Sequence, residues 1–236
     1  MLFPGISVDR MDTDTVSAVN THEKILDHFK EENIPVLIGT QMVAKGLILL
    51  GVTLVGVLDA DLGLYTDNFR AAETTFNMLT QVVGRAGRGD SAGKAILQTM
   101  NPRHKVIELA ASQDYDGFYD LEIGLRRVQN APPFGDFAMV VFTGMDEARV
   151  LHGAAKFKSS LQKLLNTPDF QGEICTVLGP APCPVPKINY NFRHRLTLRC
   201  RMTKKLRFLL AHLLRQFSQD RENRGVTAFI DINGYD

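Results

Sequence analysis

The run Val36-Leu37-Ile38-Gly39-Thr40-Gln41-Met42-Val43-Ala44-Lys45-Gly46 is the part of the sequence that decides the fold. It opens with a short apolar run that ends in Gly-Thr, which is typical of a buried parallel strand giving way to a loop. Backbone amides in such a turn can approach a phosphate closely, because glycine has no side chain to keep the phosphate away. Taken alone this signal is weak, since most Gly-Thr turns are plain connections.

Strands and helices alternate on the C-terminal side of this run. Residues 52–58 form a second apolar run, which Asp59-Ala60-Asp61 closes, and residues 94–99 resemble another strand. Between them, residues 68–83 are predicted to form an amphipathic helix, because apolar side chains recur at helical spacing at Phe69, Ala72, Phe76, Leu79 and Val83. This alternation predicts an α/β layer with a parallel sheet.

A second motif closes the predicted helix, with the sequence Gln81-Val82-Val83-Gly84-Arg85-Ala86-Gly87-Arg88-Gly89. Its two arginines leave the helix on a flexible backbone. Arginine is always charged and can donate two parallel hydrogen bonds to phosphate oxygens. Such a pair of arginines can therefore stabilise the charge on a transferring phosphoryl group. The alternative is a helix C-cap with two solvated arginines.

Together the two motifs resemble motifs V and VI of superfamily 2 helicases. The longer pattern resembles the primosomal protein N′ family of replication-restart helicases, and only its C-terminal portion. The resemblance covers nearly the whole chain, and the residues that carry it are 39–46, 52–61, 69–73, 81–88, 98–102, 132–135 and 178–182.

The resemblance implies an ATP-dependent DNA helicase that reloads the replication machinery at stalled forks, with ATP and magnesium as its cofactors. Motif V would couple DNA contact to the nucleotide site through Gly39, Thr40, Gln41, Lys45 and Gly46. In motif VI, Gln81, Arg85 and Arg88 would face the ATP phosphates, on a turn made by Gly84 and Gly87. Arg88 is the expected arginine finger and Arg85 its partner.

The sequence departs from the family in three respects. No G-x-x-x-x-G-K-[ST] loop and no acidic magnesium box is present, and residues 89–95 lack the spacing and the hydroxyl that such a loop needs. The family's paired-cysteine zinc module is also missing. Leu47-Ile48-Leu49-Leu50 replaces a stretch that is acidic in the family. We therefore expect a fragment or truncated product that begins inside the second motor lobe and cannot hydrolyse ATP alone.

The second half has a different element order, which begins after two prolines in residues 130–135. Strands are predicted at 137–143, 176–178, 192–202 and 226–232, with a proline-rich loop after the second. Helices are predicted after Asp146, which can cap the first of them, and at 204–219. The order β-α-β-β-α-β predicts a ferredoxin-like domain. We predict a partial RecA-like helicase lobe at 1–103, a helical linker at 104–133 and an α+β DNA- or partner-binding domain at 134–236.

A basic strand lies in that last domain, although the net charge of the whole chain is only +1. No acidic residue occurs between Glu173 and Asp220. On an extended strand the side chains alternate, so one face would carry Phe192, His194, Leu196, Leu198, Cys200 and Met202 as core. The other face would carry Arg193, Arg195, Arg199 and Arg201. Phosphates are a natural counter-charge for this arginine row, and the alternative is a solvated sheet face.

Two neighbours strengthen this prediction of a DNA-binding surface. Lys187 adds charge, and Tyr190 could stack on a base. The resemblance adds forked or single-stranded DNA, the single-strand-binding protein and primosome proteins as partners.

The remaining composition fits a cytoplasmic protein. Cys175, Cys183 and Cys200 lack metal-ligand spacing, the histidines are scattered, and we predict no metal site and no membrane partner. Two other functions stay open. One is a non-catalytic nucleic-acid or partner-binding module that retains motor remnants. The other is an unrelated nucleotide-binding α/β enzyme, which the missing phosphate loop disfavours.

Overall fold

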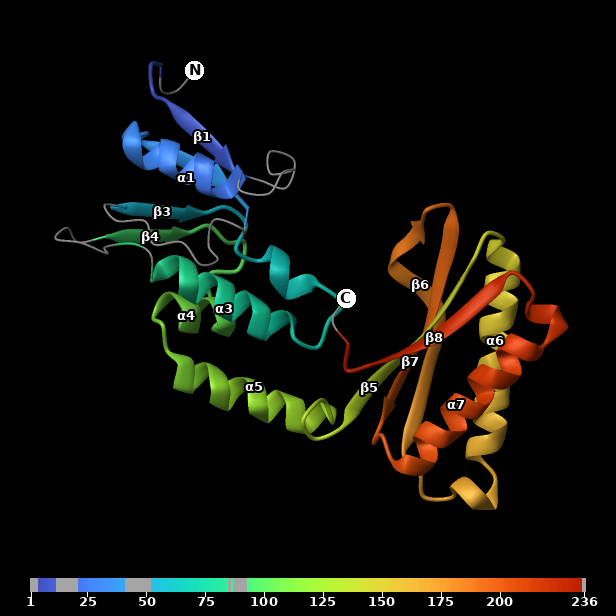
Figure 1. The fold of residues 1–236 in the computed structure, drawn as a ribbon. Helices are drawn as coiled ribbons and strands as arrows, with labels where there is room; N and C mark the ends of the chain where they lie inside the picture. Colours follow the sequence, from blue (N-terminus) through green and yellow to red (C-terminus); the bar gives the residue numbers. More distant parts are fainter. Residues whose placement is uncertain (1–3, 12–20, 41–51, 85, 87–92, 235–236) are drawn as a thin grey trace. The chain divides into compact units, whose positions relative to one another are not determined.

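A computed structural model describes residues 4–11, 21–40, 52–84, 86 and 93–234. The chain divides into two compact units, which are described separately (Figure 1). Unit 1 consists of Met1–Thr66 and Arg70–Tyr119, and unit 2 consists of Asp67–Phe69 and Asp120–Asp236. Unit 2 is therefore discontinuous in sequence.

Unit 1 contains two pairs of parallel strands. β1 (Val8–Met11) pairs with β2 (Val36–Gly39), and α1 (Thr21–Glu31) lies between them in the chain. β3 (Leu54–Val57) pairs with β4 (Lys94–Leu97). The parallel pairing confirms the α/β layer that the alternating pattern predicts.

The core of unit 1 lies where α3 (Ala71–Val83) meets α4 (Lys105–Ala111) and the start of α5 (Tyr115–Gln129). The rings of Phe76 and Phe118 stack with their centroids 4.0 Å apart. Leu79 is fully buried beside them, as the helical spacing predicts. The prediction was wrong for Phe69, because α3 begins only at Ala71 and Phe69 belongs to unit 2.

The segment predicted as a linker consists of two helices and a sharp turn. α4 and α5 are separated at Gln113, whose φ of 56° is incompatible with a continuous helix. The Asp114 carboxylate then accepts a hydrogen bond from the Gly117 amide and caps α5. Residues of both helices enter the core of unit 1, namely Val106, Ile107, Ala110 and Phe118.

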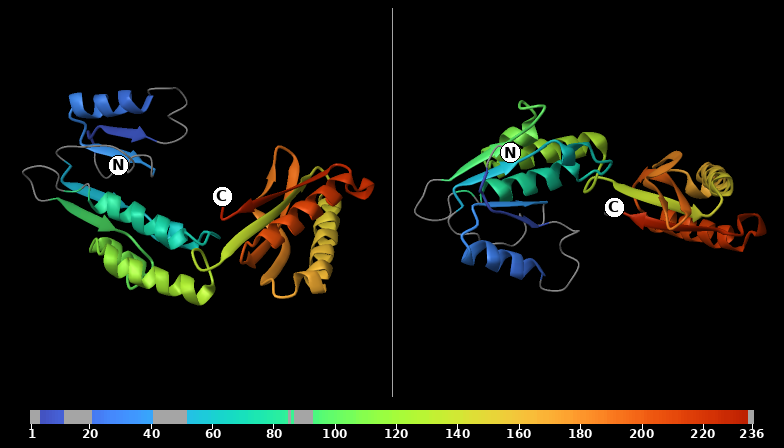
Figure 2. Two further views of the ribbon diagram at one scale, coloured as in Figure 1. Left: turned by 60° about the horizontal axis from the view of Figure 1, so that its bottom comes forward. Right: turned by 90° about the horizontal axis from the view of Figure 1, so that it is seen from above.

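Unit 2 has the predicted β-α-β-β-α-β order. Its elements are β5 (Asp136–Gly144), α6 (Glu147–Leu165), β6 (Cys175–Ile188), β7 (Asn191–Cys200), α7 (Lys204–Gln219) and β8 (Val226–Ile232). The strands form one antiparallel sheet in the order β6-β7-β5-β8, which is the ferredoxin-like arrangement. Both helices lie against one face of the sheet (Figure 2), and we call the other face the open face.

Helix caps and apolar packing hold unit 2 together. The Asp146 carboxylate accepts a hydrogen bond from the Arg149 amide, which confirms the predicted cap of α6. Thr203 caps α7 in the same way. Between the sheet and the helices, Phe142, Phe157 and Phe217 contact one another edge to face.

β6 is longer than predicted. The expected short strand and proline-rich loop together form one irregular strand, which ends at Ile188. Prolines at 180, 182, 184 and 186 are compatible with it because β6 is an edge strand and needs no donors on its outer side. A two-residue turn follows, in which Asn189 and Tyr190 both have positive φ, as type I′ hairpins require.

Among the helices that the structure describes, none is long and apolar enough to cross a membrane.

Candidate nucleotide and nucleic-acid interfaces

The first motor motif begins at the carboxyl end of a parallel strand. Gly39 is the last residue of β2 and pairs with Met11, and the Thr40 amide donates to the Met11 carbonyl over 3.4 Å. In open α/β sheets, ligands bind beyond this end of the strands, and Gly39 and Thr40 lie at this end of β2. Gln41, Lys45 and Gly46 lie outside the described residues, as does the Leu47-Ile48-Leu49-Leu50 stretch.

The second motor motif begins on the last turns of α3. Gln81 is exposed there, and the Gly84 amide donates to the Thr80 carbonyl as the helix ends. The helix therefore ends at Val83, before the two arginines of the motif. Arg85, Gly87 and Arg88 lie outside the described residues, so their predicted roles rest on the sequence.

An acidic residue that the sequence analysis did not single out has a structural role in unit 1. Asp61 follows β3 and is 4% exposed. Its carboxylate accepts hydrogen bonds from the Thr99 hydroxyl (2.8 Å) and the Met100 amide (2.7 Å). It thereby fixes the chain that leaves β4. Only its place after an apolar strand could have drawn attention to it.

On β7 the predicted alternation of side chains is confirmed. His194, Leu196, Leu198 and Cys200 are at most 5% exposed and face the helices. The arginine row at 193, 195 and 199 lies on the open face, and Arg201 follows the end of the strand. His194 is therefore a core histidine, as predicted, with its Nε2 3.7 Å from Glu147.

The arginine row is engaged within unit 2. Arg195 forms an ion pair with Asp67 and also contacts the Met139 sulfur, and its side chain is only 12% exposed. Arg193 donates to the Val185 carbonyl over 3.4 Å. Arg199 lies over the ring of Phe137, 5.7 Å from its centroid. The row is thus less available for phosphates than the alternation alone suggests.

The segment Asp67–Phe69 accounts for part of this coverage. The Phe69 ring packs on Phe137 at 5.4 Å, and the Arg126 guanidinium lies 5.5 Å from the Phe69 centroid. Acidic Asp67 comes from far outside the acid-free interval of the sequence. No pattern local to β7 could have predicted its contact with Arg195.

The hairpin tip between β6 and β7 presents the other two predicted DNA-contacting residues. Tyr190 is 79% exposed and has a φ of 65°, a strained conformation for an aromatic residue. The Lys187 ammonium lies 4.3 Å from the centroid of Phe192. Proteins that bind single-stranded nucleic acids combine exposed aromatic rings, on which bases stack, with cations along the groove.

A second cationic surface runs along α7, and the arginine-row prediction missed it although its residues lie in the same acid-free interval. We call it the α7 face and define it by Lys204, Lys205, Arg207, Phe208, His212 and Arg215, all of them exposed. Phe208 is 72% exposed. Within the described residues, Lys204, Arg207 and Arg215 form no ion pair.

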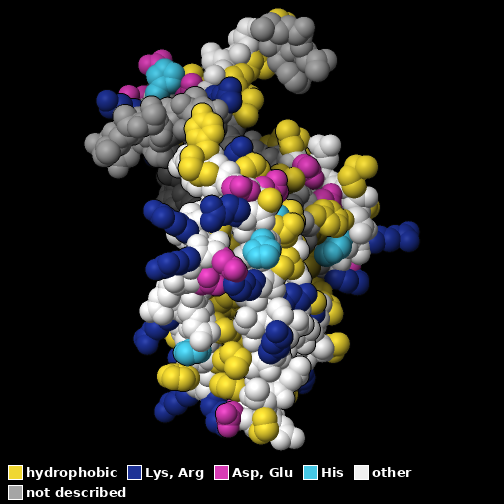
Figure 3. All heavy atoms as spheres, turned by 90° about the vertical axis from the view of Figure 1, so that its right-hand side faces the viewer, with side chains coloured by type: hydrophobic (Ala, Val, Ile, Leu, Met, Phe, Trp, Pro, Cys, Tyr) yellow, Lys and Arg dark blue, Asp and Glu magenta, His cyan; other side chains and the backbone are white. Residues whose placement is uncertain are grey.

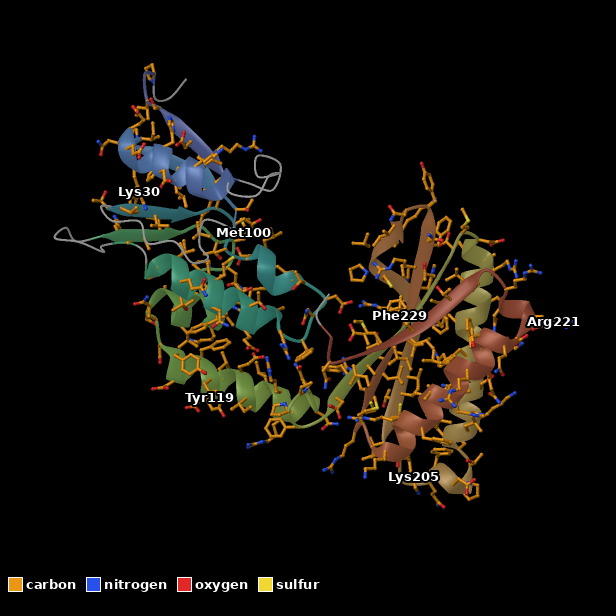
Figure 4. All side chains as sticks on the ribbon, in the orientation of Figure 1. Lys30, Met100, Tyr119, Lys205, Arg221 and Phe229 are labelled. Atoms are coloured by element: carbon orange, nitrogen blue, oxygen red, sulfur yellow. The ribbon has the colours of Figure 1, made fainter. Side chains whose placement is uncertain are left out.

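The placement of charge on α7 is unfavourable for the helix itself. Lys204 and Lys205 occupy its first turn, which contains no acidic residue. Cations at this end oppose the helix dipole and cost about 0.3–1 kcal/mol each. Figure 3 shows Lys and Arg side chains spread over the side of the molecule where the helices of unit 2 lie, and Figure 4 labels Lys205 at the start of α7. Among the described residues, no three His, Cys, Asp or Glu side chains are grouped to hold a metal ion.

Comparison with known proteins defines the class. Residues 2–90 match the helicase conserved C-terminal domain, so this part of the chain is the RecA-like second lobe of a helicase. Residues 127–235 match the C-terminal domain of primosomal protein N.

The relatives define the family more closely. The chain is 38% identical to the replication restart protein PriA of Bacillus subtilis over 234 residues, which is 99% of this chain and 28% of that protein. It is 36% identical to the Synechocystis PriA, covering 84% of this chain and 23% of that protein. It is 32% identical to the Chlamydia muridarum PriA, covering 98% of this chain and 30% of that protein. The chain belongs to the PriA family, and it spans between about a quarter and a third of the length of these relatives.

Proposed function

We propose that this chain supplies the second motor lobe and a DNA-facing domain to an ATP-dependent helicase that restarts stalled replication forks. The observation that carries the proposal is the pairing of a helicase lobe with the primosomal C-terminal domain in one chain. In this division of labour, residues 1–103 belong to the motor, 134–236 bind DNA or a protein partner, and 104–133 lie between them.

The proposed motor chemistry needs residues from a first lobe. Arg88, with Arg85 and Gln81, would stabilise charge on the transferring phosphate, while the 39–46 turn couples DNA contact to the nucleotide. ATP and magnesium would be held mainly by a phosphate loop and an acidic box, neither of which this sequence contains. Any zinc of the complete helicase would belong to a separate cysteine-rich module.

The isolated chain should therefore not hydrolyse ATP. The test is a DNA-stimulated phosphate-release assay on the purified chain, with Arg88→Ala as the matched variant. ATP turnover by the unsubstituted chain that is lost in Arg88→Ala would refute the prediction that the chain is inactive. An unrelated background ATPase would persist in both proteins. A supplied first lobe that restores turnover would favour the helicase over the alternative, a non-catalytic binding module.

For DNA, two cationic surfaces of unit 2 compete. One consists of Arg193, Arg199 and Arg201 with the hairpin tip, and the other is the α7 face. The cations of the α7 face are the less engaged. Arg193 donates to the Val185 carbonyl and Arg199 lies over the Phe137 ring, whereas Lys204, Arg207 and Arg215 make no such side-chain contact within the described residues. We assign the principal phosphate contacts to the α7 face, with Tyr190 as a stacking contact. Cytoplasmic location and contacts with the single-strand-binding protein and primosome proteins belong to the same proposal.

The experiment compares two triple variants by fluorescence anisotropy on forked and single-stranded DNA. One carries Lys204→Gln, Arg207→Gln and Arg215→Gln, and the other carries Arg193→Gln, Arg199→Gln and Arg201→Gln. Each lost phosphate contact should lower the slope of log affinity against log salt by about one unit. The α7 variant should lose more slope than the β7 variant. The reverse order would reassign the contacts to β7, and unchanged slopes in both would exclude a DNA surface here.

A further inference from the structure

Cys175 and Cys200 face each other across the first pair of residues in the β6–β7 ladder. The neighbouring Arg201 amide donates to the Ile174 carbonyl over 3.3 Å, which makes 174 and 201 a hydrogen-bonded pair. Because such pairs alternate along an antiparallel ladder, the two cysteines occupy a non-hydrogen-bonded position. There the Cα atoms lie about 4.5 Å apart and the side chains are closest. Disulfides need a Cα separation of roughly 4.4–6.8 Å, so this position can be bridged.

The two thiols also share one environment. Directly opposed residues point to the same face of a sheet, and here that face packs on the helices. Cys200 is 1% exposed inside the core, and Cys175 packs against that core while remaining partly exposed. Hence Cys175 is the partly exposed member of the pair and Cys200 is the buried member.

The protonation of the pair is asymmetric. A hydrogen bond from the Cys200 thiol lowers the pKa of Cys175. The same contact, with burial, raises the pKa of Cys200. Cys175 is also the more exposed of the two residues, and thiolates are the reactive form of cysteine, so we assign Cys175 as the nucleophile and Cys200 as the resolving thiol.

We propose that Cys175 and Cys200 form an oxidisable dithiol, which a hydroperoxide converts to a disulfide between β6 and β7. The Cys175 thiolate attacks one peroxide oxygen, the O–O bond breaks, and protonation of the leaving oxygen gives water (an alcohol for an alkyl hydroperoxide) and a Cys175 sulfenic acid. The Cys200 sulfur then attacks the sulfenic sulfur. The S–O bond breaks, and the hydroxide leaves as water with the Cys200 proton. Two thiols are oxidised by two electrons, and one peroxide is reduced.

The test uses the whole chain treated with hydrogen peroxide under native conditions. Accessible thiols are counted after unfolding, and peptides are mapped by mass spectrometry. The count should fall from the three cysteines of the chain to one, the remaining thiol should be Cys183, and the mass should drop by two hydrogens. Dithiothreitol should restore all three thiols.

The control variants separate the pair from the third cysteine. Cys183→Ser should form the disulfide as readily as wild type, whereas Cys175→Ser and Cys200→Ser should form none. Peptide mapping of the unsubstituted protein decides the matter even if a variant fails to fold. Three thiols retained after treatment, a bridge to Cys183, links between chains, or Cys175 oxidised further to a sulfinic acid would each overturn the proposal.

Discussion

Asp67 pairs with the Arg195 guanidinium, although 128 residues separate them in the sequence. Arg195 lies in the middle of an interval that contains no acidic residue, so its counter-charge has to come from elsewhere. Asp67 supplies it as part of unit 2, on the open face of the sheet. The cost of lining up like charges on β7 is thereby reduced.

Removing the Asp67 charge should destabilise unit 2 modestly. Arg195 is largely buried but Asp67 is 75% exposed, and solvent screening reduces the energy of such a pair. We expect Asp67→Asn to lower the free energy of unfolding by about 1 kcal/mol. Urea denaturation followed by circular dichroism measures it. Asp120→Asn, a matched change on the exposed side of α5, should shift stability by less than about 0.5 kcal/mol. Equal effects would mean that the pair contributes nothing.

His194 should be replaceable by a leucine without loss of stability. It is 5% exposed, and its Nδ1 atom is buried without a hydrogen-bond partner, which is costly. His194→Leu should leave the urea midpoint unchanged or raise it. In contrast, Leu196→Ala, two residues along the same core face, should cost about 2–5 kcal/mol by creating a cavity. A large loss in His194→Leu would show that the contact with Glu147 outweighs the unpaired nitrogen.

The pH dependence of unit 1 should include a contribution from His28. A hydrogen bond to the Asp9 carboxylate, 3.1 Å away, raises the pKa of His28 above 6.5. A raised pKa stabilises the folded state at low pH, and this stabilisation is lost as the pH rises through the folded-state value. An NMR titration of the imidazole should show a midpoint above 6.5 that falls in Asp9→Asn. Asp27→Asn, on the same helix, should leave it in place. An unshifted midpoint in the wild type would exclude the pair in solution.

Arg88 should be essential once a first lobe is present. In a complete helicase that contains this segment, Arg88→Ala should lower ATP turnover on the order of 10³-fold or more while largely sparing nucleotide affinity. Stopped-flow phosphate release gives the first quantity, and a fluorescent nucleotide titration gives the second. Arg103→Ala, a control arginine outside both motifs, should change neither. Turnover unaffected by Arg88→Ala would withdraw the arginine-finger assignment.

Periodicity predicted the elements of unit 2 well, because α6, α7, β7 and β8 each alternate or repeat over a long stretch. Periodicity failed where tertiary contacts determine the position or the partner of a residue. Phe69 has helical spacing, yet its ring packs on Phe137 in unit 2. The prolines of β6 indicate a loop when the sequence is considered alone. They are compatible with a strand because β6 lies at the edge of the sheet. The arginine row was found by alternation, but its engagement with Asp67 depends on residues distant in sequence.

The prolines of β6 also limit how the sheet can associate with other chains. Prolines at 180, 182, 184 and 186 have no N–H group, so this stretch of the edge strand β6 has few backbone donors with which another strand could pair. The opposite edge, β8, contains no proline and exposes Phe229 and Ile232. Edge-to-edge aggregation, or extension of the sheet by a peptide strand, would therefore proceed through β8.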